Sequence, residues 1–198
     1  MRCAIVFALG VIFSGTEAFA QGTVNFANNS FTAVYCDFVG GQRVPRGPFF
    51  QAELMYAPDG TPTDLFDTVA IRLGAATTFN SPVDGIFIGG ARTAPTASPG
   101  GIGLFQVRVW ESAYGFDYRS TVASGNPNAH AGTSAILRVD TGNPTLTPPE
   151  TPVSLVGAGL TSFSIGGLSG SFPCIPEPST CALALLGASL LWFLRRRA

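Results

Sequence analysis

His130 is the only histidine in the chain, and a nucleophilic hydrolase would need it as the base. It lies in the polar segment at residues 126–132, which predicts an exposed loop. The chain has no Gly-x-Ser-x-Gly motif, the strand-to-helix turn that presents a catalytic serine. A Cys36–His130 pair is the alternative, but one cysteine and one histidine without further context do not identify a site. We therefore expect no catalytic residue and interpret the chain as non-enzymatic.

Acidic residues indicate two further kinds of chemistry. Asp59, Asp64 and Asp67 could offer oxygen ligands to calcium, but their spacing matches no EF-hand loop, and aspartates in turns often bond their own backbone. A single histidine and the absence of Cys-x-x-Cys give no recognisable zinc site, so we expect no metal and no cofactor. Glycoside cleavage requires a pair of carboxyl groups, whose separation the sequence does not give. Four acids are candidates for that pair: Glu53, Glu111, Asp117 and Asp140.

Aromatic residues favour a third activity, the binding of carbohydrate. Trp110 falls on the polar face of a predicted strand, and Tyr114, Phe116 and Tyr118 follow it closely. An aromatic ring can stack on the aliphatic C–H face of a pyranose. The alternative is that these rings pack against a second sheet, as large aromatic side chains usually do. The candidate sugar contacts are Trp110, Tyr114 and Tyr118.

The central part of the chain is weakly acidic. Residues 21–172 hold seven arginines and ten acidic residues, a net charge of −3, and the chain has no lysine. Nucleic-acid binding needs a basic face that displaces counterions from phosphates, and these scattered arginines provide none. We therefore exclude nucleic acid as a partner.

Turn-forming residues occur throughout the chain. It has 24 glycines and 15 prolines in 198 residues, a density that suits short strands joined by turns better than long helices. Three segments alternate apolar and polar residues as half-buried antiparallel strands do, at residues 49–56, 105–110 and 135–140. Other strands are expected at residues 24–26, 32–38, 68–73, 85–88 and 160–165, and one short helix at residues 114–123.

About eight short strands separated by turns predict an all-β fold, an antiparallel β-sandwich that is immunoglobulin-like or jelly-roll-like in outline. Residues 21–165 are expected to form this domain, since about 150 residues suffice for one hydrophobic core. The glycine- and serine-rich residues after Ile165 predict a flexible spacer at residues 166–174.

The first 20 residues predict a secretory signal peptide. Met1 and Arg2 form a short positive start, residues 4–13 are apolar, and Ala18 and Ala20 give the small-x-small pattern that signal peptidase accepts. The alternative is a buried N-terminal helix, but the turn-rich sequence that follows offers such a helix little to pack against. We expect the signal helix to be removed and the chain to be exported.

The C-terminal segment predicts a single transmembrane helix. Residues 181–194 carry no charge and would span about 21 Å as a helix, less than the ~30 Å hydrocarbon core of a bilayer. A docked C-terminal helix is therefore the alternative. Apolar residues on every face, Trp192 near the end and the cluster Arg195-Arg196-Arg197 favour membrane insertion with the arginines in the cytoplasm.

Cys36 and Cys174 are the cysteines of the predicted exported part, because Cys3 lies in the signal peptide and Cys181 in the apolar tail. In an oxidising compartment they could form a disulfide, which would contribute about 4 kcal/mol in the chain-entropy model. The alternative is two unpaired thiols, one in a strand and one near the membrane. Spacing alone does not decide between them.

Pro176-Glu177-Pro178 stands before the predicted membrane helix. Both prolines have a fixed φ and no N–H, so the tripeptide is extended and presents Glu177 as a lone carboxylate outside the membrane. The order Ile-Pro-Glu-Pro-Ser-Thr, apolar segment and Arg-Arg-Arg closely resembles the PEP-CTERM sorting signal of exported bacterial proteins, in which valine is common where Ile175 stands. The resemblance covers residues 175–198.

This resemblance implies handling by an exosortase, an integral membrane enzyme that cuts near the Pro-Glu-Pro motif. It also implies placement on the cell surface or in a biofilm matrix, since such proteins tend to accompany exopolysaccharide production. Residues 21–28 and 106–111 are more weakly similar to segments of PEP-CTERM proteins with small β-domains, which implies placement and no activity.

We therefore expect an exported protein with a structural or adhesive role. Its partners would be signal peptidase, an exosortase and the membrane, which holds the C-terminal helix until processing. A carbohydrate-binding module for exopolysaccharide is the alternative. An extracellular hydrolase that uses an acid such as Glu111 is a third interpretation.

Overall fold

A computed structural model gives the structure of the chain at residues 21–37 and 41–168. The predicted signal peptide, the Pro176-Glu177-Pro178 motif and the C-terminal helix with its arginines lie outside the described residues. Within the described ranges, no helix has the length and apolar character needed to cross a membrane.

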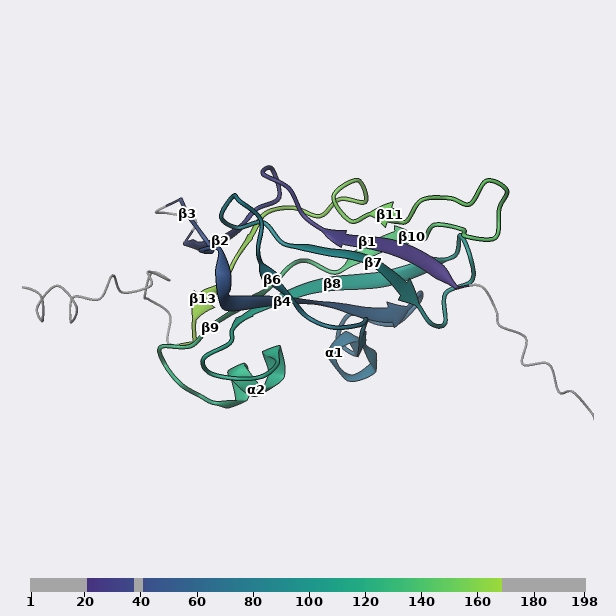
Figure 1. The fold of residues 1–198 in the computed structure, drawn as a ribbon. Helices are drawn as coiled ribbons and strands as arrows, with labels where there is room; N and C mark the ends of the chain where they lie inside the picture. Colours follow the sequence, from purple (N-terminus) through teal and green to yellow (C-terminus); the bar gives the residue numbers. More distant parts are fainter. Residues whose placement is uncertain (1–20, 38–40, 169–198) are drawn as a thin grey trace, which may run out of the picture.

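Strands make up most of the regular secondary structure of the described residues, and two short helices interrupt them (Figure 1). In chain order the elements are β1 (Gly22–Ala27), β2 (Val34–Asp37), β3 (Gln42–Arg43), β4 (Gly47–Pro58), α1 (Phe66–Val69), β5 (Ile71–Arg72), β6 (Thr77–Phe79), β7 (Ile88–Ala94), β8 (Ile102–Glu111), α2 (Tyr118–Ala123), β9 (His130–Thr133), β10 (Leu137–Asp140), β11 (Val153–Ser154), β12 (Phe163–Ser164) and β13 (Gly166–Gly167). The prediction of an all-β fold is confirmed at this level.

The long strands β4 and β8 form the centre of a seven-stranded sheet. They pair in antiparallel fashion from Phe50 opposite Glu111 to Pro58 opposite Gly103. The order across the sheet is β13-β9-β8-β4-β5, with β10 also paired to β8 and β6 to β4. Apolar residues alternate along both central strands, and those on one face belong to the main hydrophobic core.

A second sheet, with the order β11-β1-β7, covers that apolar face. The main core lies between the two sheets, and Figure 1 shows β1 and β7 above β4 and β8. Phe87 is at the centre of an aromatic cluster, with its ring centroid 4.8 Å from that of Phe26 and 5.8 Å from that of Phe79. The hydroxyls of Tyr56 and Thr96, 2.8 Å apart, join β4 to the segment after β7.

A third, small sheet has the order β12-β2-β3. β12 pairs with β2 in parallel, as β11 does with β1, so the sheets are not wholly antiparallel as the alternation predicted. Both parallel partners are two-residue strands from the last part of the described chain. Cys36 lies on β2 and is buried in the main core, whereas Cys174 lies outside the described residues, so their disulfide stays a prediction.

The opposite face of the large sheet, here called the outer face, is also covered. Figure 1 shows α1 and α2 below this face, and Phe66 of α1 packs there in a smaller core with Met55, Ala57, Ala70 and Leu104. The alternation of polar residues predicts that this side of β4 and β8 faces solvent, and for these two strands that prediction is wrong. The chain returns across the outer face after β4 and again after β8, which buries polar residues that period-two alternation assigns to the surface.

The segment leading into β7 differs most from the prediction. The expected strand from Gly85 is a loop, because Gly85 has a φ of 76° and its N–H and C=O bond to the backbones of Val44 and Val34. The strand starts only at Ile88 and continues through Gly89, where an added side chain would approach the Phe26 ring to 2.3 Å. Gly89 therefore allows β7 to approach the Phe26 ring of β1 closely.

Three further boundaries differ from expectation. The helix predicted at residues 114–123 begins only at Tyr118, after the N-cap Asp117. Residues 68–73, expected to be one strand, hold the end of α1 and the short β5. β13 lies within the residues predicted as a spacer and pairs with β9, so the sheet extends beyond Ile165.

Replacing Phe87 with alanine should test the aromatic cluster. The substitution removes the ring that contacts both Phe26 and Phe79, and we expect the free energy of unfolding to fall by about 3–5 kcal/mol. Phe31→Ala is the matched control, because this ring is 90% exposed and its loss should change stability by no more than about 0.5 kcal/mol. Urea denaturation measures both, and equal losses at the two positions would contradict the described core.

Candidate functional site

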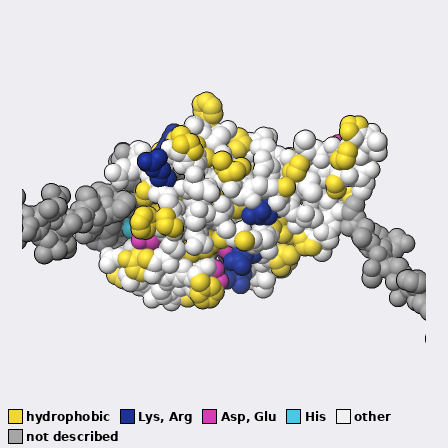
Figure 2. Space-filling model, viewed as in Figure 1, with side chains coloured by type: hydrophobic (Ala, Val, Ile, Leu, Met, Phe, Trp, Pro, Cys, Tyr) yellow, Lys and Arg dark blue, Asp and Glu magenta, His cyan; other side chains and the backbone are white. Residues whose placement is uncertain are grey.

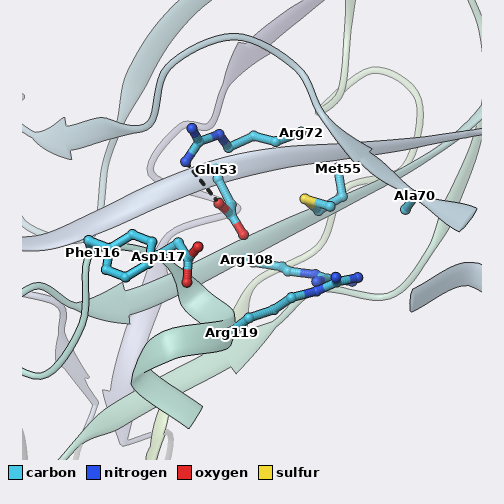
Figure 3. Close-up of a pocket in the computed structure, with 8 residues that line it drawn as sticks. All are labelled: Glu53, Met55, Ala70, Arg72, Arg108, Phe116, Asp117 and Arg119. Carbon is cyan, nitrogen blue, oxygen red and sulfur yellow. Dashed lines mark ion pairs between the residues drawn. The ribbon is translucent and has the colours of Figure 1, made fainter. Parts of the chain in front are cut away.

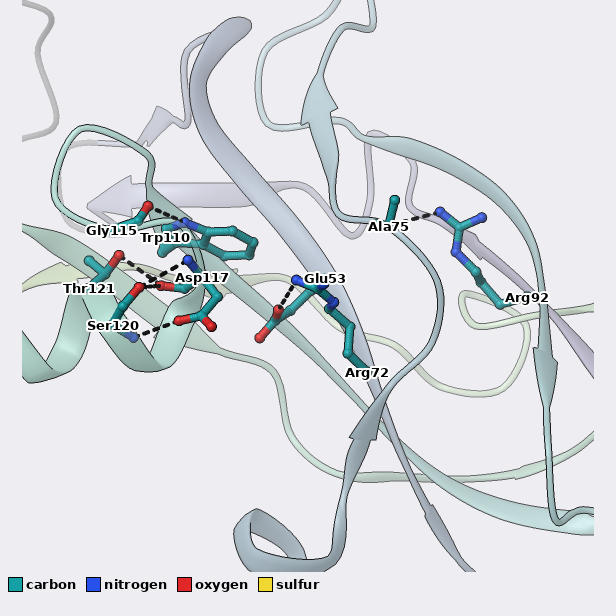
Figure 4. Close-up of polar contacts among 9 residues, drawn as sticks. All are labelled: Glu53, Arg72, Ala75, Arg92, Trp110, Gly115, Asp117, Ser120 and Thr121. Carbon is teal, nitrogen blue, oxygen red and sulfur yellow. Dashed lines mark hydrogen bonds and ion pairs between the residues drawn. The ribbon is translucent and has the colours of Figure 1, made fainter.

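The three aromatic residues predicted to contact sugar do not form an exposed surface. Trp110 is fully buried, and its Nε1 donates a hydrogen bond to the carbonyl of Gly115, 3.1 Å away (Figure 4). Tyr114 and Tyr118 are half-buried, and the Arg108 guanidinium lies 5.3 Å from the centroid of the Tyr118 ring. The prediction that Trp110 contacts sugar is wrong, because the loop before α2 covers the face of β8 that carries it.

His130 is buried in a strand, although its polar neighbours predicted an exposed loop. It begins β9, is 7% exposed, and its Nδ1 lies 2.9 Å from Oε2 of Glu111 on the adjacent strand. Its ring also meets Phe50 edge-on, with centroids 6.5 Å apart. The loop prediction is wrong because β13 pairs with β9 beyond the expected end of the domain. The described contact of the imidazole is with a carboxylate, while Cys36 lies on β2 in the main core.

The three aspartates considered for calcium have different surroundings. Asp59 accepts two hydrogen bonds of 2.9 Å from Arg138, and Asp67 forms an ion pair with Arg108. Asp64 is exposed. In the part of the chain that the structure describes, no group of three or more histidine, cysteine or acidic side chains is arranged to hold a metal ion. These contacts give Asp59 and Asp67 structural roles.

Two of the four candidate carboxylates do meet, in a pocket on the outer face of the large sheet (Figure 3). Glu53 comes from β4 and Asp117 from the start of α2, whereas Glu111 contacts His130 and Asp140 lines a separate pocket. On the surface seen in Figure 2, acidic and basic side chains lie side by side near the middle of the molecule. The pocket has a volume of about 340 Å³ and is lined by Glu53, Met55, Ala70, Arg72, Arg108, Phe116, Asp117 and Arg119.

Glu53 is only 4% exposed, although it carries a carboxyl group. Strand pairing places it opposite Arg108, and its Oε2 lies 3.8 Å from a guanidinium nitrogen of Arg72, longer than a hydrogen bond. Burial raises the pKa of the Glu53 carboxyl, and the positive charges of Arg72 and Arg108 only partly oppose this effect. A buried carboxylate with so little compensation marks a candidate for ligand contact.

Asp117 caps the N-terminus of α2. Its Oδ1 accepts a 2.7 Å hydrogen bond from the N–H of Ser120, whose Oγ in turn accepts one from the N–H of Asp117 (Figure 4). Partial burial acts to raise the pKa of Asp117, but the hydrogen bonds from Ser120 and the charges of Arg72 and Arg119 outweigh it and lower this pKa. The pocket therefore holds two carboxyl groups whose pKa values are shifted in opposite directions.

Three arginines surround these two acids; Arg108 connects α1 to the sheet, and Arg119 connects α2 to α1. Arg108 is 2% exposed, its Nε donates to Oε1 of Gln106 at 3.0 Å, and its terminal nitrogen pairs with Asp67 of α1. Arg119 of α2 donates to the backbone carbonyl of the same Asp67. Asp67 therefore links α1, α2 and β8, and these contacts fix one wall of the pocket.

Phe116 lies at the pocket and is 83% exposed. Both of its neighbours are fixed, since Gly115 accepts the hydrogen bond from Trp110 and Asp117 caps α2. A side chain at position 115 would come within 2.5 Å of the backbone nitrogen of Thr121, so this close packing requires glycine. The ordered backbone of this loop therefore places an exposed ring beside the two acids.

The sequence carries part of the signal for this pocket. Glu53 and Arg108 fall on the polar sides of two predicted strands, but their pairing depends on the register between β4 and β8. The cover that α1 and α2 give them is a long-range effect that alternation does not contain. For the same reason, strand alternation selects the buried Trp110 over Phe116, which lies outside any strand.

The substitution Glu53→Gln keeps the side-chain shape and removes the charge. Because burial raises the pKa of Glu53 above its ordinary 4.5, the folded protein holds this proton more tightly than the unfolded chain does. The stability gained from that proton is present below pH 4.5 and is lost as the pH rises through the folded-state pKa. We therefore expect the unfolding free energy of Glu53→Gln, relative to wild type, to increase as the pH rises above 4.5.

Denaturant unfolding at several pH values measures this difference. Asp64→Asn, at an exposed turn, is the matched control, and its difference from wild type should stay constant. A difference for Glu53→Gln that does not change with pH would contradict the effect of burial on this carboxyl.

Comparison with known proteins gives the chain no relative from which a function can be transferred. The chain matches no protein-family model, no curated protein and no solved structure. The residues and their geometry are therefore the basis on which its function has to be inferred.

Proposed function

We propose that the chain is an exported protein of the bacterial cell surface or extracellular matrix, with a non-enzymatic structural or adhesive role. The observation that carries this proposal is the C-terminal order of Pro176-Glu177-Pro178, an uncharged segment and Arg195-Arg196-Arg197. Its resemblance to the PEP-CTERM signal supports recognition by an exosortase. The pattern of the first 20 residues supports cleavage by signal peptidase and export through the inner membrane.

In this proposal the C-terminal helix is a temporary membrane anchor. Its apolar segment is short for a bilayer, and the rigid Pro-Glu-Pro tripeptide before it presents a carboxylate where a membrane enzyme can reach it. Cleavage near this motif would release the chain to the cell surface or the matrix.

The described residues support a structural or adhesive role by their architecture. Two sheets with a large apolar core between them form a body that presents loops and turns to its surroundings. We assign this body to the β-sandwich architecture, immunoglobulin-like or jelly-roll-like in outline.

Binding of exopolysaccharide is a second candidate function. The observation that favours it is the exposed ring of Phe116 beside a pocket that contains Glu53, Asp117 and two surface arginines. Sugar-binding sites combine these two elements, an apolar platform and charged hydrogen-bonding groups.

The variant Glu177→Ala tests the sorting proposal. Without the carboxylate between the two prolines, the tripeptide stays extended but loses the charge proposed to be recognised, so processing should decrease. Expressed in a bacterial host that has an exosortase, this variant should leave at least several-fold more full-length chain in the membrane fraction than wild type does. Immunoblotting of membrane and culture fractions measures the ratio.

The matched control is Asp64→Ala, which removes an exposed acid far from the tail in sequence. In the host with an exosortase, Asp64→Ala should be processed to the same extent as wild type. In a host without an exosortase, Glu177→Ala and wild type should not differ. If Glu177→Ala is processed as fast as wild type where the enzyme is present, the sorting proposal fails.

A further inference from the structure

We propose that the pocket formed by Glu53, Arg72, Asp117, Arg119 and Phe116 binds a neutral sugar residue of a polysaccharide. This inference rests on the second candidate function and specifies its site and ligand chemistry. The acids and arginines would bind the sugar hydroxyls, and the exposed phenyl ring would cover one face of the sugar.

The charge balance of the pocket favours a neutral ligand. Arg108, the third arginine, is already compensated by its ion pair with Asp67. That leaves two carboxylates, Glu53 and Asp117, facing two arginines, Arg72 and Arg119. The two acids would repel an anionic ligand and the two arginines would repel a cationic one. The net charge of the pocket therefore favours neither kind of ion.

Sugar hydroxyls suit this pattern because each can both donate and accept a hydrogen bond. The Glu53 carboxylate is an acceptor open to a ligand: the residue is almost completely buried, its side chain lines the pocket, and its described polar contact is the 3.8 Å approach of Arg72. A hydroxyl group between these two side chains could donate to Glu53 and accept from Arg72. It would supply the hydrogen bonds that the folded protein alone does not make.

Phe116 supplies the apolar contact that a sugar ring needs. Its ring is exposed and lies at the pocket, and the Gly115 carbonyl and the Asp117 cap hold the backbone on both sides of it, so the ring moves only by rotation of its own side chain. Because the backbone on both sides is already ordered, a ligand that contacts this ring has to order only the rotation of one side chain. Scattered single apolar residues are common on protein surfaces, so it is the place of Phe116 beside the two acids, and not its exposure alone, that favours a role in binding.

The dimensions and the acids of the pocket favour binding over cleavage. A volume of about 340 Å³ lies at the lower end of the ~300–1,000 Å³ of small-molecule sites, enough for a short part of a glycan. Glycoside cleavage would need a second carboxylate free to act as base or nucleophile. Oδ1 of Asp117 is already committed to the helix cap, so this carboxylate is suited to be a fixed acceptor.

Titration calorimetry with the full chain tests the proposal, in a detergent whose head group is not a sugar. The probes are neutral tetrasaccharides of glucose, galactose and mannose, with a tetrasaccharide of galacturonate as the acidic comparison. We expect wild type to bind at least one neutral probe more tightly than the acidic one. Phe116→Ala should weaken that binding about 10-fold, and Glu53→Gln about 10- to 100-fold.

Phe31→Ala and Asp64→Asn, which remove an exposed ring and an exposed acid elsewhere, should leave binding unchanged. Thermal unfolding of each variant confirms that it is folded. Retention on insoluble polysaccharide that survives both pocket substitutions would overturn the assignment of this pocket and leave polysaccharide binding itself standing. Failure of wild type to bind any tetrasaccharide or polysaccharide would end both, and neither outcome depends on how the C-terminal tail is processed.

Discussion

The pairing of β4 with β8 is the interaction on which the rest of the structure depends. Its register sets Leu54 opposite Val107 and, one residue earlier on β4, Glu53 opposite Arg108. Side chains alternate along a strand, so a shift of one residue would exchange the two faces and move the charges into the main core. The apolar face must meet the sheet formed by β1, β7 and β11, and this requirement excludes the shifted pairing. The hydrophobic core therefore also fixes where the charges of the pocket lie.

Charges fixed in this way need partners on the outer face, and the two helices provide them. Arg108 is almost wholly buried, yet it has Asp67 on α1, Gln106 on its own strand and the ring of Tyr118 on α2. A buried guanidinium with these contacts is tolerated, whereas one without them would be strongly destabilising. Two interactions thus hold the helices on this face: the apolar packing of Phe66 and the ion pair between Asp67 and the buried Arg108.

Local sequence patterns predicted the clearly alternating strands and failed for several short strands and for the faces of the sheet. Alternation identified the segments of β4, β8 and β10, because period-two placement of apolar residues follows from the geometry of a strand. Alternation misplaced Trp110, and the polar neighbours of His130 misplaced that residue, because burial of such positions depends on other segments, here the loop before α2 and strand β13. The strand predicted at residues 85–88 lay too early for a related reason: Gly89 belongs to β7, where it admits the Phe26 ring of the neighbouring strand. The pocket was only half predictable, since Glu53 and Asp117 were candidates but nothing local joined them.

Glu53 shows how binding and stability can oppose each other within one fold. The same face of β4 carries Met55 and Ala57, which pack in an apolar cluster under α1. An apolar residue at position 53 would suit such surroundings better than a carboxylate whose described ion pair is 3.8 Å long. A ligand hydroxyl that completes the hydrogen bonding of Glu53 would bind the folded state alone and would stabilise it by mass action. The carboxylate that lowers the stability of the free protein is then the group through which ligand binding raises it. Position 53 therefore reports on binding more directly than the buried aromatic side chains do.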